Sequence, residues 1–313
     1  MNTPMNPQSN AMPESPVDTQ VPAPTVISAT RRMYWSVRRE LWESRSIYIA
    51  PLAAGGLALA GFLISTIHLP GKMHAALALN PMQQHDLIER PYNFAAFLIM
   101  GSTFIVAIFY CLDALHGERR DRSILFWKSL PVSDLTTVLS KASIPIVILP
   151  LLTFAITVVT QCIMLLLNTT ALLGNGPSLS MLWGHLSLWH MSLMLLFHLL
   201  AIHGLWYAPF YGWLLLVSGW ARRLPFLWAA LPLLAIGVVE KIAFNTLHFG
   251  AMLEHRMGGP GSAASAANSM SMDSLMQVSL GQFLMSPGLW IGLAVTAAFL
   301  AAAVRLRRYR EPI

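Results

Sequence analysis

The sequence predicts an all-α integral membrane protein with six transmembrane helices, an N-terminal amphipathic surface helix and a short helix in the first cytoplasmic loop. The chain is 55% hydrophobic and only 11% charged, and its mean hydropathy is +0.57. Several apolar runs reach the roughly 20 residues that a helix needs to cross about 30 Å of hydrocarbon. In a soluble protein this surface would face water, at a cost of about 25 cal/mol per Å².

The N-terminal segment divides into a polar tail and an amphipathic stretch. Residues 1–30 are rich in Pro, Ser, Thr, Asn and Gln, so we expect a disordered tail. In residues 31–46, bulky and basic side chains recur at helical spacing, namely Tyr34, Trp35, Arg38, Leu41 and Trp42. This pattern indicates a helix on the membrane surface, with its arginines facing the anionic head groups of membrane lipids. An ordinary basic flank without a separate helix is the alternative.

Residues 47–313 are predicted to form the six-span transmembrane domain. The expected spans are 47–67, 94–115, 143–167, 187–218, 225–245 and 289–306. Ser133 is a candidate N-cap for a helix whose first turn holds Asp134. Helical residues from there to Leu167 would extend about 50 Å, so this helix should project beyond the membrane, with kinks at Pro145 and Pro150.

Lysine and arginine are distributed unequally between the two sides of the predicted protein. Sixteen of the 20 lie on one side, in the N-terminal flank, the loops after the second and fourth spans, and the C-terminal tail. The other side holds Lys72, Arg90 and Arg256, while Lys241 lies within a span. Because basic residues stay on the cytoplasmic side, we expect a multi-pass protein of the bacterial inner or plasma membrane with both termini in the cytoplasm.

The first cytoplasmic loop, residues 116–134, combines many charges with bulky apolar residues. Its sequence is HGERRDRSILFWKSLPVSD. A helix of about ten residues across the membrane surface would place Arg119, Ser123, Phe126 and Leu130 on one side. Apolar anchors surrounded by charges suit docking into a cleft of another protein. The alternative is an interfacial loop whose aromatic rings lie among the lipid head groups.

The segment ERRDRSILFWKSLPVSD resembles the first cytoplasmic loop of ABC-2 type transporter permeases, in which a Glu-Arg pair, a Ser or Thr and a Ser-Leu-Pro-x-Ser ending recur. The six-span plan, the surface helix and the long outer loop before the last span resemble that family too. The resemblance implies a coupling helix seated in a cytoplasmic ABC ATPase subunit, which binds ATP and Mg²⁺, and a second permease, identical or related. It assigns the ATPase-coupling role to Glu118, Arg119, Arg120, Ser123, Phe126, Trp127, Leu130 and Pro131.

The same resemblance implies that Glu118 fastens the coupling helix, either to the ATPase or to the preceding surface helix. The chain itself lacks the phosphate-binding motif G-x-x-x-x-G-K-[ST], since Gly71-Lys72 is followed by Met73 and has no glycine five residues earlier. We therefore expect no enzyme activity and no cofactor on this chain. The resemblance implies an exporter that is driven by ATP on another subunit. An ATP-independent secondary transporter and a membrane scaffold are the alternatives.

The predicted fourth and fifth spans hold the candidate residues for a substrate path. LWYAPFYGW at residues 205–213 should kink at Pro209, and Gly204 and Gly212 permit close approach of another helix. Its rings either pack or face lipid, or they line a permease dimer interface or an amphipathic substrate path; they are Trp206, Tyr207, Phe210 and Tyr211. Glu240 is either a structural anchor near the outer membrane edge or a residue in substrate passage.

Other classes of site are not expected. Cys111 and Cys162 lie in apolar runs, which argues against a disulfide or a thiolate metal site. Histidines 185, 190, 198 and 203 lack the spacing of metal ligands. The net charge of +6 comes from residues that flank spans, so we expect no nucleic-acid partner. The outer loop, 246–288, combines the flexible stretch GGPGSAASAANSMSM with an interfacial helix in DSLMQVSLGQFLMSP.

Overall fold

The computed structural model describes residues 28–66, 80–121, 123, 132–173, 182–183, 188–258 and 280–309. Within these ranges the regular elements are all helices, with no strand. Six helices are long and apolar enough to cross a membrane: Ser46–Thr66, Leu87–Arg120, Asp134–Ala171, Leu188–Trp206, Pro225–Phe244 and Pro287–Tyr309. The predicted all-α, multi-pass membrane architecture is therefore confirmed.

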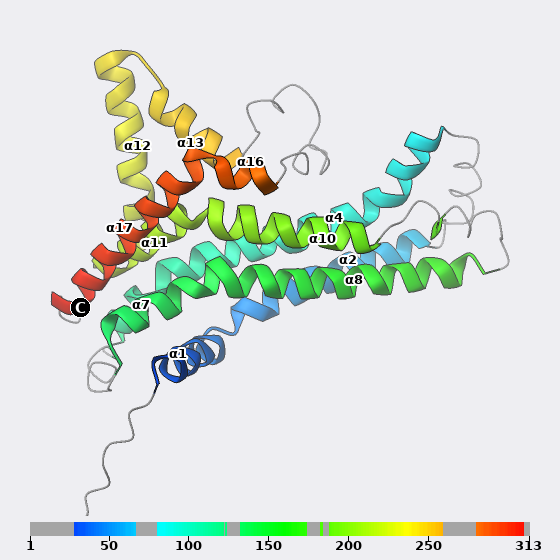
Figure 1. Ribbon diagram of the computed structural model, residues 1–313, viewed down its shortest axis with the longest axis horizontal. Coiled ribbons are helices and arrows are strands. Elements are labelled where there is room, and N and C mark those ends of the chain that lie inside the picture. Colours follow the sequence, from blue (N-terminus) through cyan, green and yellow to red (C-terminus); the bar gives the residue numbers. More distant parts are fainter. Residues whose placement is uncertain are drawn as a thin grey trace, which may run out of the picture.

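The surface helix α1 (Ala29–Glu43) precedes the first span as a separate helix. The side chain of Ser28 accepts a hydrogen bond from the Arg31 amide and caps its start. After a break at residues 44–45, α2 (Ser46–Thr66) continues in a different direction, so that Figure 1 shows α1 nearly end-on and α2 from the side. The Arg38 guanidinium lies 5.1 Å and 5.0 Å from the ring centroids of the exposed Trp35 and Trp42.

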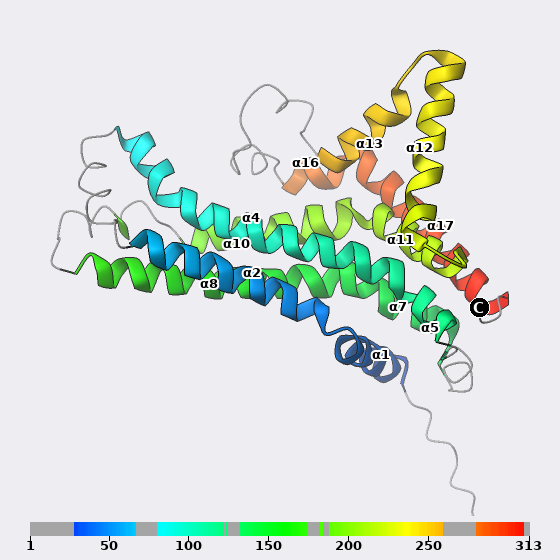
Figure 2. The same ribbon diagram turned by 180° about the vertical axis from the view of Figure 1, so that it is seen from behind.

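The centre of the molecule is a bundle in which α2, α4 (Pro81–Ala114) and α8 (Leu149–Ala171) lie side by side (Figures 1 and 2). Ile99 of α4 is fully buried between them. The helix α4 begins at Pro81, earlier than the expected residue 94, because the polar residues before 94 continue the same helix beyond the apolar run. A proline is favoured in the first helical turn, where its missing N–H costs no hydrogen bond.

The third span runs from Asp134 to Ala171. It consists of α7 (Asp134–Ser143), the π-helical stretch η1 (Ile144–Ile148) and α8. The predicted cap is confirmed, since the Ser133 hydroxyl accepts a hydrogen bond from the Thr136 amide at 3.1 Å. Its 38 residues extend about 57 Å, so the helix projects well beyond a hydrocarbon layer. The distortion lies at Pro145, where η1 interrupts the α-helical hydrogen bonding.

The long fourth apolar run is broken into α10 (Leu188–His198), the π-helical stretch η2 (Leu199–Trp206) and α11 (Ala208–Trp220). The break falls at Tyr207, and Pro209 occupies the first turn of α11. A Cβ atom on Gly204 would lie 2.6 Å from the carbonyl oxygen of Ile146. The two π-helical stretches therefore pack against each other at a distance that only glycine permits.

The last helices are α12 (Pro225–Phe244), α13 (His248–Gly258), α16 (Leu280–Met285) and α17 (Pro287–Tyr309). α17 packs along α11, whereas α12 stands away from the bundle (Figures 1 and 2). All residues of α12 are described, and Ala229 is its single buried residue. Near its start, α12 is held by the Trp220–Trp228 ring contact, at 4.8 Å between centroids, and by a hydrogen bond from Trp213 to the Ala229 carbonyl.

The helix α13 was not predicted, because residues 246–288 read as a loop. Its residues Ala, Met, Leu, Glu and Arg favour helix formation. We call the end of the bundle that holds α1, the start of α7, residues 221–224 and the end of α17 the basic end (Figure 2).

Candidate functional site

The described part of the first loop begins with the short helix α5 (His116–Arg120) at the basic end. Glu118 and Arg119 are buried there, with 6% and 4% of their surfaces exposed. Arg120 is exposed and pairs with Asp121, Nε to Oδ1, at 3.0 Å. The Ser123 hydroxyl donates to the Glu118 carbonyl at 3.4 Å. Four of the predicted coupling residues, Phe126, Trp127, Leu130 and Pro131, lie outside the described residues, as does most of the predicted coupling helix.

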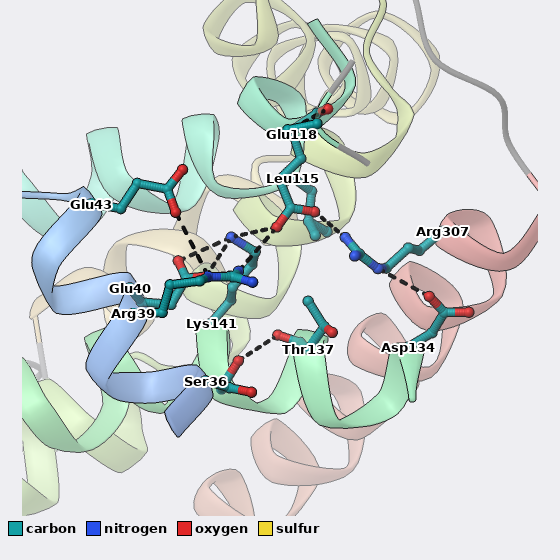
Figure 3. A network of polar contacts seen from close by, with 12 residues as sticks. Ser36, Arg39, Glu40, Glu43, Leu115, Glu118, Asp134, Thr137, Lys141 and Arg307 are labelled. Carbon is teal, nitrogen blue, oxygen red and sulfur yellow. Dashed lines mark hydrogen bonds and ion pairs between the residues drawn. The ribbon is translucent and has the colours of Figure 1, made fainter. Parts of the chain in front are cut away.

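Glu118 is the centre of a buried ion-pair network at the basic end (Figure 3). One carboxylate oxygen lies 3.2 Å from Lys141 Nζ in α7 and 3.4 Å from Arg39 Nη2 in α1. The other accepts a short hydrogen bond from Arg307 Nη1 in α17. Glu118 thus contacts α1, the helix before the first span, together with α7 and α17.

A second buried carboxylate, Glu40 of α1, shares the same lysine. Lys141 Nζ lies 3.0 Å from each of its oxygens, and the Tyr110 hydroxyl donates to Oε2 at 3.0 Å. Glu40 and Lys141 have only 2% and 3% of their surfaces exposed. Two charges so far from water are stable only because they are paired and hydrogen-bonded.

The network ends at Asp134, in the first turn of α7. Its Oδ1 accepts a hydrogen bond from Arg307 Nε at 3.0 Å. The three carboxylates are thus matched by three cations, which together form the basic-end network: Glu40, Glu118, Asp134, Arg39, Lys141 and Arg307 (Figure 3). It connects α1, α5, α7 and α17 through side chains alone.

The charge state of Glu40 follows from this environment. Burial alone raises the pKa of the Glu40 carboxyl, but the charges of Lys141 and Arg39 and their hydrogen bonds outweigh it. The net result is a pKa below the ordinary value. Glu40 is therefore ionised at neutral pH, as an ion-pair network requires.

Arg119 points to the opposite side, toward the end of α11. Its Nη1 donates to the carbonyl oxygens of Gly219 and Ala221, at 2.9 Å and 3.3 Å. A cation is favourable at a helix C-terminus, where the carbonyl groups lack partners. The Ser218 hydroxyl also accepts hydrogen bonds from two backbone amides, Leu115 and His116. The Glu-Arg pair thus fastens α5 to α11 as well as to the basic-end network.

A polar cavity of about 370 Å³ lies beside α5, between α1 and the end of α4. Among the charged residues of its lining, acidic ones outnumber basic ones: Glu40, Glu43, Asp113, Glu118 and Asp121 against Arg45 and Lys141. A partner surface that entered this cavity would therefore meet more carboxylates than cations.

The aromatic candidates of the fourth span are divided between two environments. Tyr211 is buried in the bundle core, with 2% of its surface exposed. Trp206 is buried too, whereas the Tyr207 hydroxyl donates to the Met257 carbonyl of α13 at 2.7 Å. Trp206 and Phe210 line an apolar cavity between α11, α12, α13 and α17.

Glu240 lies near the end of α12 and caps α13. Its carboxylate accepts hydrogen bonds from the amides of His248 and Phe249, at 2.6 Å and 2.8 Å, and from the Thr246 hydroxyl at 2.8 Å. These are the unpartnered amides of a helix start, which a carboxylate satisfies well. The contacts of Glu240 are those of a structural anchor.

Five members of the basic-end network were not singled out from the sequence as ion-pair partners: Arg39, Glu40, Asp134, Lys141 and Arg307. Lys141 and Arg307 read as ordinary basic flanks, and Asp134 as a residue of a first helical turn. One signal was available, because acidic residues are scarce in this chain and Glu40 and Glu118 both lie beside span ends on the predicted cytoplasmic side.

No group of His, Cys, Asp and Glu within the described ranges has the arrangement of a metal site. His198 and His203 lie 5.8 Å apart between ring centroids, among aromatic neighbours. No protein-family model, curated protein or solved structure matches this chain.

Proposed function

We propose that this chain is the membrane permease subunit of an ATP-driven transporter of the ABC-2 type, an exporter that works as a permease dimer with separate ATPase subunits. The observation that carries the proposal is the attachment of Glu118 and Arg119 at the start of the first loop. Glu118 contacts α1, α7 and α17, and Arg119 contacts the end of α11. The residues that resemble a coupling loop are thus joined to four other helices.

This attachment supports transmission of movement. A loop tied only to its own two helices would yield locally when a partner pushed it. Here, displacement of α5 has to move Lys141 and Arg307 with it, because separating a buried carboxylate from its cations costs several kcal/mol. In the proposed mechanism, ATP binding draws two ATPase subunits together, and the coupling helix passes that movement to α1, α7, α11 and α17.

The orientation belongs to the same proposal. The basic end faces the cytoplasm, where the ATPase resides, and both termini lie on that side. The polar cavity beside α5, in which acidic residues outnumber basic ones, then opens toward the ATPase surface and suits basic residues on it.

The test compares ATPase association between variants. Affinity-tagged full-length protein is purified from membranes of its native host, and the ATP hydrolysis that co-purifies is measured for the wild type and for Phe126→Ala/Trp127→Ala. The matched control is Trp189→Ala, which removes an aromatic ring that is 81% exposed on α10. We expect co-purified hydrolysis to fall at least tenfold in the double variant and to stay within twofold of wild type in the control.

Two results would contradict the proposal in different ways. Equal hydrolysis in all three proteins would show that Phe126 and Trp127 do not hold the ATPase. Absence of any ATPase from wild-type preparations that remain folded and still transport would favour an ATP-independent secondary transporter. A scaffold role would gain if the protein showed neither hydrolysis nor transport.

A further inference from the structure

An apolar cavity of about 500 Å³ lies between α11, α12, α13 and α17. This volume is within the roughly 300–1,000 Å³ of typical ligand pockets. Aromatic rings come from the end of η2, with Trp206, and from α11, with Phe210 and Trp213. Ile236 and Phe299 come from α12 and α17. Because α12 stands away from the bundle (Figure 1), the cavity is next to a helix whose apolar side chains are exposed.

One cation, Arg256 of α13, forms part of the cavity wall. Its guanidinium lies over the Trp206 ring, 4.1 Å from the centroid, and its Nη1 donates to the Gly288 carbonyl at 2.8 Å. Its Nη2 is buried and has no hydrogen-bond partner among the described residues. None of the ion pairs between described residues includes Arg256.

The Arg256 guanidinium is partly buried without a counter-charge among the described residues. Burial lowers the pKa of Arg256, as it does for a cation that is withdrawn from water without a counter-charge. A guanidinium pairs well with carboxylate or phosphate oxygens. Among the described residues no anion pairs with this guanidinium, and the walls around it favour an apolar chain.

The dimensions fit an amphiphile. The lining residues of α17 extend from Gly288, beside Arg256, to Phe299, which is about 16 Å along a helix. Half of a bilayer's hydrocarbon layer is roughly 15 Å thick. Gly288 and Gly292 carry no side chains, so the guanidinium lies directly against α17 at one end of this length.

We propose that this cavity binds an anionic phospholipid of the surrounding bilayer, with its phosphate group beside Arg256 and one acyl chain between α12 and α17. A phospholipid with net negative charge supplies the missing counter-charge, whereas a choline head group brings a second cation to the same place. The site depends on the chain lying in a membrane and not on the proposed ATPase partner.

The experiment uses full-length protein in nanodiscs of equimolar phosphatidylglycerol and phosphatidylcholine, released into a native mass spectrometer so that retained lipids are identified by mass. The variants are Arg256→Gln, Arg256→Lys and the control Arg90→Gln, an exposed arginine on α4. We expect the wild type and Arg90→Gln to retain phosphatidylglycerol about fivefold more than phosphatidylcholine, as one basic residue near head groups would give. Arg256→Gln should bring this ratio close to one, and Arg256→Lys should keep most of it.

A second variant tests the apolar part without changing charge. Ile236→Trp adds volume from α12, at a side chain that is 49% exposed. We expect it to reduce retention of both lipids at least threefold.

Three outcomes would overturn the proposal. The first is a ratio of phosphatidylglycerol to phosphatidylcholine that Arg256→Gln leaves unchanged. The second is a fall of this ratio in Arg90→Gln as large as that in Arg256→Gln. The third is lipid retention that Ile236→Trp leaves unchanged. If Ile236→Trp instead separates dimers into monomers while lipid retention stays the same, a second copy of the chain covers this face and the lipid proposal is wrong.

Discussion

The basic-end network and the apolar cavity beside α12 differ in whether their charged side chains have ion-pair partners. At the basic end, two buried carboxylates and the partly exposed Asp134 meet three cations, and the pairs connect four helices. At the cavity, Arg256 has no ion-pair partner among the described residues, and α12 buries one residue, Ala229. The comparison shows that charged side chains pair with one another in the first region, whereas the second leaves a buried guanidinium nitrogen and an exposed apolar helix without partners among the described residues.

The largest effect should come from breaking the network at its centre. Glu118→Gln leaves Lys141 and Arg307 buried without their shared carboxylate, which should lower the free energy of unfolding by about 3–5 kcal/mol. The measurement is reversible unfolding in mixed detergent micelles, followed by circular dichroism. Glu43→Gln, at a side chain that is 58% exposed, should change stability by less than about 0.5 kcal/mol. Equal losses in both would show that the network is not the rigid part of the molecule.

A smaller effect is expected at the close contact between η1 and η2. Gly204→Ala would place a methyl group 2.6 Å from the Ile146 carbonyl oxygen, and this overpacking should cost about 1–3 kcal/mol. Gly237→Ala on α12, where nothing lies within 4 Å, should be neutral or stabilise by up to about 1 kcal/mol. A tolerated Gly204→Ala would mean that η1 and η2 separate easily, and the contrast between the two regions would weaken.

Acid should weaken the basic-end network before it affects the cavity. Because the pKa of Glu40 is lower in the folded protein than in the unfolded chain, its contribution to stability is complete above about pH 4.5 and is lost as pH falls through the folded pKa. Unfolding measured between pH 3 and pH 6 should show this loss, and Glu40→Gln should flatten that part of the curve. An identical pH dependence in the wild type and in Glu40→Gln would show that Glu40 carries no such linkage.

The smallest effect is expected at an exposed position of α12. Ile242 on α12 is 79% exposed, so Ile242→Ala should change the free energy of unfolding by less than about 0.5 kcal/mol. Ile99→Ala, at a fully buried position in α4, should cost about 2 kcal/mol or more because it leaves a cavity. A large loss in Ile242→Ala would reveal packing on α12 that the isolated chain lacks.

Much of the fold could be predicted from the sequence, because bilayer thickness imposes a length on apolar runs. The spans at 47–67 and 225–245 differ by one residue from the observed Ser46–Thr66 and Pro225–Phe244. Ser133 was identified as a cap from local spacing alone, and the structure confirms it. α13 was missed because its start depends on the Glu240 carboxylate, which reaches it from the preceding helix.

The basic-end network was beyond prediction for a different reason. Glu118 is separated from Arg39 by 79 residues and from Arg307 by 189, and no local pattern relates such positions. The rule that places arginine and lysine on one side of the membrane explains their side, but not their partners. The sequence therefore indicated Glu118 as a fastening residue without deciding what it fastens.

The hydrogen bonds and the ring contact that join α12 to other described helices lie near its two ends. Near its start it is held by Trp213 and Trp220, and near its end by the contact of Glu240 with α13. Between these two contacts, no residue of α12 is buried by the described part of the chain. A sideways bow of α12 would enlarge or shrink the space in front of α17 without unwinding any helix, so the capacity of that space can change while the rest of the bundle keeps its shape.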